Sequence, residues 1–183
     1  MLPFALLLAA AAVDQGEERL AAMTKLYEEV CLKAFPDDGA VAAEMLRRGA
    51  KPLDAEQVKV TLGKDPGVGW TLPLGSEAAL VFVELPPYHA CSVRWPMPGE
   101  YKLTDYHAVE DAYRKANPGF KPIKPMEADM AGLHIHGVGV ARKLPDGMET
   151  LLVVDQRVTD PTRRANGETG VMLRFVRQVT DKH

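Results

Sequence analysis

Apolar residues near the N-terminus recur at steps of three and four, which is typical of an amphipathic helix. This first helix is predicted to begin at Asp14, which has capping-box spacing to Glu17, and to end at Pro36. Its apolar stripe consists of Leu20, Met23, Tyr27, Val30, Cys31 and Ala34. A second helix is predicted over Ala40–Arg48, with Asp38 near its cap.

The segment after the second helix fits two kinds of structure. Asp54 can cap a short third helix, but Val58, Val60 and Leu62 also alternate as they would in a strand. The turn-rich sequence KDPGVG at 64–69 then separates this segment from the rest of the chain.

From residue 70 onward the period of the apolar positions changes to two, which indicates strands. Strands are predicted over Ala79–Leu85 and His89–Trp95, with a shorter one over Trp70–Leu74. A helix capped by Thr104 or Asp105 follows them.

The last third of the chain is predicted to form three closing strands, at Leu133–Lys143, Thr150–Thr159 and Val171–Thr180. The proline-containing segment 120–130 leads into them as an extended surface connection. Pro145–Gly147 is a predicted hairpin turn, because proline presets φ and glycine takes the left-handed conformation. Asp160–Thr169 is a longer, polar hairpin loop.

This order of elements predicts an α+β domain. We expect an antiparallel sheet of about five strands, with N-terminal helices and one inserted helix packed on it, because the chain lacks the long crossovers that parallel strands need. Two strands, one helix and three strands is also the order of profilin-like and PAS-like domains, an analogy of fold that carries no function.

Length and charge narrow the class of protein. A chain of 183 residues with a formal net charge of −3 fits one domain. Lys and Arg form no basic block, so nucleic-acid binding is not expected. Apolar residues are plentiful along the chain, which excludes a disordered protein.

The N-terminal run Leu2–Val13 is uncharged and too short to span a bilayer, which takes about 20 apolar residues. Because it ends in the small residues Ala10–Ala12, it is typical of a secretory signal peptide. We expect residues 1–12 to be the signal peptide and 13–183 one periplasmic or secreted domain, with no membrane span in the mature chain. The alternative is that this run is the apolar start of the first helix.

Cys31 and Cys91 are expected to form a disulfide, because paired cysteines are typical of an oxidising compartment. Cys31 lies on the apolar stripe of the first helix, and Cys91 shares an apolar strand face with Val93 and Trp95. Both thiols are therefore predicted to point inward, as a bridge from helix to sheet requires. Closing a loop of this length stabilises by about 4 kcal/mol in the chain-entropy model. Two buried free thiols are the alternative.

His134 and His136 form an H-x-H pair on a predicted strand, and residues two apart on a strand share a face. Both imidazoles could reach one metal ion if a third ligand were present. The candidates for that ligand are His89, His107, Glu127, Asp129 and Asp155. The alternative is a solvent-facing pair without metal. No feature of the sequence requires a cofactor, and none is predicted.

Several arginines fall within predicted strands, namely Arg94, Arg142, Arg157 and Arg174. On one face they would form a surface for anions or for a partner, because a guanidinium binds a carboxylate through two hydrogen bonds. The alternative is a solvated face on which Glu84 and Asp155 neutralise them.

The following segments together carry a resemblance: Cys31-Leu32, Phe35-Pro36-Asp37, Gly69-Trp70, Pro86-Pro87, Ala90-Cys91-Ser92-Val93 and Leu173–Gln178. They are similar to a family of small exported proteobacterial proteins of uncharacterised function. The resemblance implies a periplasmic location and paired cysteines. It implies no activity and supplies no functional residues.

The sequence contains no G-x-S-x-G elbow and no C-x-x-C pair, and no catalytic residues are predicted. We therefore expect a non-catalytic periplasmic protein that binds an envelope protein or a small ligand through one sheet face and its loops. A metal-dependent hydrolase using His134 and His136 is one alternative. A structural subunit of a cell-envelope complex is another.

The disulfide can be tested by alkylating the purified protein under denaturing, non-reducing conditions. We expect the intact mass to show no added label, because both thiols are consumed in the bridge. Two labels per chain would mean free thiols and would contradict the prediction.

Overall fold

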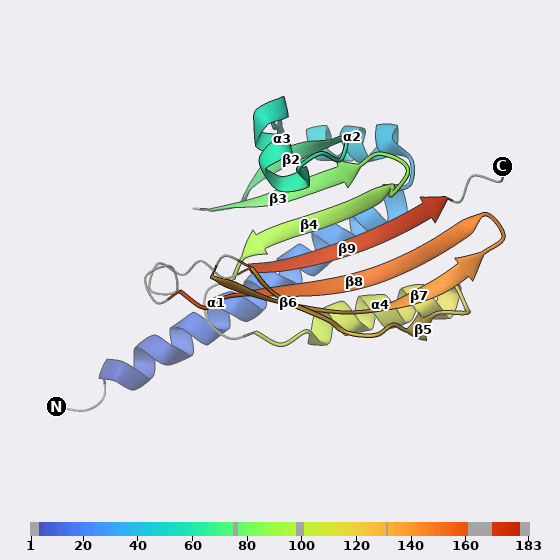
Figure 1. Cartoon of the computed structure of the whole chain (residues 1–183). Coiled ribbons are helices and arrows are strands. Elements are labelled where there is room, and N and C mark those ends of the chain that lie inside the picture. The colour runs from blue at the N-terminus through green and yellow to red at the C-terminus, as the bar shows by residue number, and fades with distance from the viewer. Residues whose placement is uncertain (1–3, 75–76, 98–100, 131, 161–169, 180–183) are drawn as a thin grey trace.

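One long helix crosses an antiparallel sheet, and shorter helices pack around it (Figure 1). The computed structural model describes residues 4–74, 77–97, 101–130, 132–160 and 170–179. The helices are α1 (Phe4–Tyr27), the π-helix η1 (Glu28–Ala34) that continues it, α2 (Asp38–Arg47), α3 (Ala55–Leu62) and α4 (Thr104–Ala116). The strands are β1 (Lys51–Pro52), β2 (Gly67–Leu74), β3 (Glu77–Glu84), β4 (Ala90–Pro96), β5 (Lys121–Pro122), β6 (Met126–Met130), β7 (Leu133–Leu144), β8 (Gly147–Val158) and β9 (Gly170–Val179).

The α+β class and the antiparallel sheet are confirmed, but the expected number of about five strands is wrong. Within the described residues the sheet has nine strands in the order β1-β2-β3-β4-β9-β8-β7-β5, and β6 also pairs with β7. Three long strands precede α4, so the chain does not have the two-strand, one-helix, three-strand order of the profilin-like and PAS-like analogy.

The additional strands escape the sequence pattern for a physical reason. β1 and β5 are two residues long, and β6 lies within the segment predicted to be a surface connection. Each is defined by backbone pairing with a neighbouring strand, and that pairing does not depend on the type of side chain. Alternation of side chains over so few residues is not detectable.

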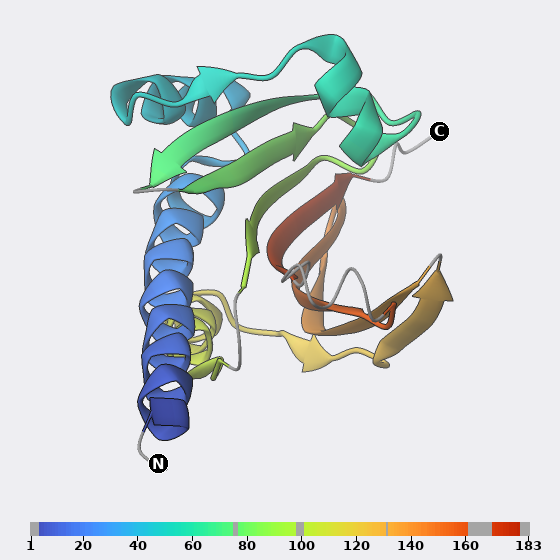
Figure 2. The ribbon, with the colours of Figure 1, turned by 90° about the vertical axis from the view of Figure 1, so that its left-hand side faces the viewer.

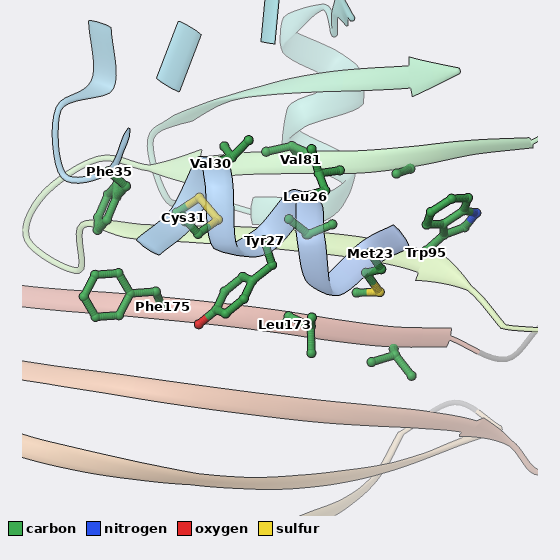
Figure 3. Packing of buried hydrophobic residues seen from close by; sticks show 14 of the residues in the cluster. Met23, Leu26, Tyr27, Val30, Cys31, Phe35, Val81, Trp95, Leu173 and Phe175 are labelled. Carbon is green, nitrogen blue, oxygen red and sulfur yellow. A yellow bond between two sulfur atoms is a disulfide. The ribbon is translucent and has the colours of Figure 1, made fainter. Parts of the chain in front are cut away.

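The helix α1 and its continuation η1 bury their apolar stripe against the middle of the sheet (Figure 3). Met23, Tyr27 and Val30 on the helix are almost fully buried among Leu173 and Phe175 of β9 and their neighbours. The helix begins before the predicted cap: Asp14 lies inside α1 rather than at its N-terminus. The sequence-predicted stripe is therefore correct, whereas the predicted start is not.

A disulfide joins this helix to the sheet, as predicted. Cys31 of η1 and Cys91 of β4 are bonded, with 5.3 Å between their Cα atoms. Both residues are fully buried. The bridge therefore lies within the core, between the helix layer and a central strand.

The opposite face of the sheet is covered by α3 at its β2–β3 end (Figure 2). Val58 and Leu62 of α3 pack on Phe82 of β3. Asp54 and Gln57 form a capping box, in which the Asp54 side chain accepts from the Gln57 backbone N–H at 2.9 Å. This cap decides the ambiguous segment in favour of a helix.

The turn between β7 and β8 lies where predicted, but its glycine has another role. Gly147 does not adopt a positive φ, unlike Gly49 and Gly119. A Cβ at position 147 would instead lie 1.9 Å from the carbonyl oxygen of Gln178. Glycine is needed there because β9 approaches closely.

Two sequence predictions concern segments that the structure describes only in part. Residues 1–3 of the expected signal peptide and residues 161–169 of the polar hairpin loop lie outside the described residues. In the part of the chain that is described, no helix is both long and apolar enough to cross a membrane.

The core can be tested with one pair of leucine substitutions. Leu173→Ala removes a fully buried side chain and should lower the free energy of unfolding by about 2–5 kcal/mol. Leu46→Ala makes the same chemical change at a position that is 63% exposed and should change it by about 0.5 kcal/mol or less. Denaturant unfolding with the disulfide intact measures both, and equal effects would contradict the placement of β9 in the core.

Candidate ligand pocket

A pocket of about 360 Å³ lies where the first turn of α4 faces β7 and β8. That volume is at the lower end of the range for small-molecule sites, roughly 300–1,000 Å³. It is lined by Tyr101, Leu103, Thr104, His107, His136, Val138, Val153, Asp155 and Arg157.

The sheet side of the pocket is built from two cross-strand pairs. His136 lies opposite Asp155, and Val138 lies opposite Val153. Because side chains alternate along a strand, all four point to the face that α1 and α4 cover. The valines supply an apolar floor, and the polar pair lies beside it.

Tyr101 and Arg157 hold the Asp155 carboxylate between them. The Tyr101 hydroxyl donates to Oδ1 at 2.6 Å, and the Arg157 Nε donates to Oδ2 at 2.8 Å. Burial and the hydrogen bond to Asp155 raise the pKa of Tyr101 well above its ordinary value. Tyr101 therefore remains a neutral hydrogen-bond donor across the physiological pH range.

Three groups around the pocket can donate a hydrogen bond and are not bonded to a carboxylate in the described structure. Leu103, the N-cap of α4, makes no side-chain capping bond, so the first backbone N–H groups of the helix lack that partner. Thr104 contributes a hydroxyl at the same place. Across the pocket, the His136 imidazole has no hydrogen-bond partner among the described residues.

His107 completes the polar wall. Its Nδ1 lies 3.4 Å from Glu110 Oε2, one turn further along α4. Glu110 lies on the buried side of α4, whereas the His107 side chain is more than half exposed. The imidazole edge away from Glu110 is thus available to a molecule in the pocket.

Of the two histidines in the H-x-H pair, only His136 lines the pocket. His134 lies on the same face of β7 but outside the pocket, and its Nδ1 is 2.9 Å from Asp129 Oδ1. Across residues 4–179, wherever the structure is described, no group of three His, Cys, Asp or Glu side chains could hold a metal ion. The H-x-H pair therefore lacks a third ligand there.

The four candidate arginines lie on two faces of the sheet and do not form one surface. Arg142 and Arg157 are on the face that carries the helices, where Arg142 contacts the buried Glu149 at 2.6 Å. Arg94 and Arg174 are on the other face, where both Arg174 Nη atoms bond to Glu84 at 2.5 and 2.7 Å.

Sequence reasoning named His107 and His136 only as metal-ligand candidates, and it did not place Tyr101 or Thr104 in a site. It named Asp155 both as a metal-ligand candidate and, with Glu84, as a carboxylate that neutralises strand arginines, and the structure shows Asp155 bonded to Arg157 and Glu84 bonded to Arg174. Tyr101 lies outside every regular element, so no periodicity marks it. One signal was available, because Asp155 shares the inward face of β8 with Leu151 and Val153. A carboxylate on a face directed toward the core needs a hydrogen-bond or ion-pair partner.

No family model, curated protein or solved structure matches this chain.

The hydrogen bond between Tyr101 and Asp155 can be tested by a pH titration. Asp155→Asn removes the charge that favours the neutral phenol, so the pKa of Tyr101 should fall toward its ordinary value while burial keeps it above that value. Ultraviolet absorbance of tyrosinate measures the change, and Tyr101→Phe identifies which step belongs to this residue. Asp129→Asn, outside the pocket, is the matched control and should leave the titration unchanged. An unchanged titration in Asp155→Asn would contradict the assignment.

Proposed function

We propose that this protein is an exported binding protein that takes a small organic anion with an apolar body into the pocket between α4 and β7–β8. The observation that carries the proposal is the set of donors around an apolar floor. His136 and Thr104 line one cavity together with His107, at the N-terminal turn of α4, where no side chain caps the helix.

The charges around the pocket favour an anionic group. Asp155 is already neutralised by Arg157 and bonded by Tyr101, so it offers no free carboxylate to a cation. The start of a helix carries a partial positive charge, which favours a negative group placed near it. A carboxylate beside Thr104 and His136 would accept hydrogen bonds that these groups otherwise lack.

The apolar body of the ligand would lie on Val138 and Val153, with Leu103 closing over it. Burial of such a surface supplies roughly 25 cal/mol per Å², and the polar contacts set orientation. A flat ring or a short branched chain fits this combination of an apolar floor and a polar wall.

The residues of the pocket favour binding over catalysis, because its carboxylate Asp155 is already bonded to Tyr101 and Arg157. The pocket holds no cysteine or serine, and neither His107 nor His136 is hydrogen-bonded to a hydroxyl among the described residues. A histidine base that activates a nucleophile needs that contact.

Export is supported by the buried disulfide, since such bonds persist in oxidising compartments.

The proposal can be tested by calorimetry with benzoate as the probe and benzamide as its neutral counterpart. Benzoate should bind and benzamide should bind more weakly, because only the carboxylate is anionic. His136→Ala should weaken benzoate binding about threefold to tenfold, the loss of one hydrogen bond.

His134→Ala is the matched control, since His134 lies two residues along the same strand but outside the pocket. It should leave binding unchanged. Equal binding of benzoate and benzamide, or equal effects of the two histidine variants, would contradict the proposed ligand and site.

A further inference from the structure

The Asp155 carboxylate, in the wall of the pocket between α4 and β7–β8, can accept more hydrogen bonds than its partners supply. An ionised carboxylate accepts up to about four hydrogen bonds. Within the described residues, Asp155 accepts one from Tyr101 and one from Arg157, each on a different oxygen. Its side chain lines the cavity and is 18% exposed, so a molecule bound there can reach the remaining acceptor positions.

The neighbours of Asp155 determine what else a ligand at this carboxylate would contact. His136 lies directly opposite Asp155 on the β7–β8 pair, and the Cβ atoms of opposite residues are about 4.5–5.5 Å apart. Val153 shares the same face of β8 and lies two residues away, which is about 7 Å along a strand. An acceptor, a histidine and an apolar surface therefore surround one small volume.

Arg157 determines which kind of donor suits the Asp155 carboxylate. The Arg157 Nε donates to Asp155 Oδ2 at 2.8 Å, so the negative charge of the carboxylate already has a positive partner. An ammonium group at the same carboxylate would lie close to this guanidinium, and the two positive charges would repel each other. A hydroxyl group donates a hydrogen bond without adding a charge. A neutral donor is therefore the better partner for Asp155.

We propose that the ligand of this pocket is a 2-hydroxy carboxylate with an apolar substituent, an inference that rests on the proposed function. The hydroxyl donates to Asp155, and the carboxylate lies beside His136 and Thr104. The apolar substituent rests on Val138 and Val153.

The shape of such an acid matches the arrangement of the pocket. The hydroxyl and the carboxylate of a 2-hydroxy acid are on adjacent carbon atoms, and Asp155 and His136 are adjacent across the strand pair. The substituent leaves the same carbon atom in a third direction. Because three different groups are held at three fixed positions, the pocket should distinguish the two enantiomers of the acid.

Calorimetry with mandelate and the disulfide-intact protein tests this inference, and phenylacetate is the counterpart without the hydroxyl. One enantiomer of mandelate should bind about tenfold more tightly than phenylacetate, which is the effect of one hydrogen bond to a charged acceptor. The other enantiomer should lose that advantage, because it cannot place all three groups at once. These comparisons need no variant, so they stand even if a substitution prevents folding.

The position of the hydroxyl provides a second comparison. 4-Hydroxyphenylacetate carries its hydroxyl at the far end of the ring, over Val138 and Val153, whose side chains accept no hydrogen bond. It should bind no more tightly than phenylacetate. Phenylglycine has an ammonium in place of the hydroxyl of mandelate and should bind more weakly than mandelate, because of the charge of Arg157.

Asp155→Ala should reduce the ratio of mandelate affinity to phenylacetate affinity from about ten to about one, because the acceptor of the hydroxyl is gone. The ratio is the useful measurement, since releasing Tyr101 and Arg157 affects both ligands. Asp129→Ala is the matched control, because Asp129 is a carboxylate near the same strand but outside the pocket, bonded to His134. It should leave the ratio unchanged.

Binding of phenylacetate as tight as that of both mandelate enantiomers would overturn this inference and leave the proposed function standing. A ratio that survives Asp155→Ala would do the same. Phenylglycine binding tighter than mandelate would indicate an amino acid as the ligand instead. Absence of binding by benzoate, phenylacetate and mandelate would overturn both the inference and the proposed function, so the two failures can be distinguished.

Discussion

The packing of α1 and η1 across β4 and β9 is the constraint on which the rest of the structure depends. The disulfide from Cys31 to Cys91 fixes the helix over the centre of the sheet, where both residues are fully buried. This helix and α4 cover one face of the sheet. Because side chains alternate along a strand, each strand residue faces either these helices or the opposite side. That alternation decides which strand side chains join the main core and which pack on α3.

The candidate pocket is a consequence of this division. On the helix-covered face, the pocket exists where the start of α4 meets β7 and β8, so its walls come from a helix terminus and its floor from Val138 and Val153.

Sequence patterns predicted the parts of this fold that repeat over many residues. The apolar stripe of the first helix, the long strands and the inward direction of both cysteines are as expected. Patterns did not predict β1, β5 and β6, whose pairing depends on a neighbour rather than on alternation. They also gave the wrong reason for Gly147, because the approach of Gln178 is a contact between distant parts of the chain.

The sequence by itself determined the fold class, the core stripe and the pairing of the cysteines, because each rests on local periodicity or on the number of residues of one kind. The sequence suggested Glu84 and Asp155 as partners for the strand arginines, but only the tertiary structure decided which polar residues meet. Tyr101 and Asp155 lie 54 positions apart, and Arg174 finds Glu84 across the intervening strand. Strand order and the twist of the sheet set those encounters, and neither is written in the spacing of residues along the chain.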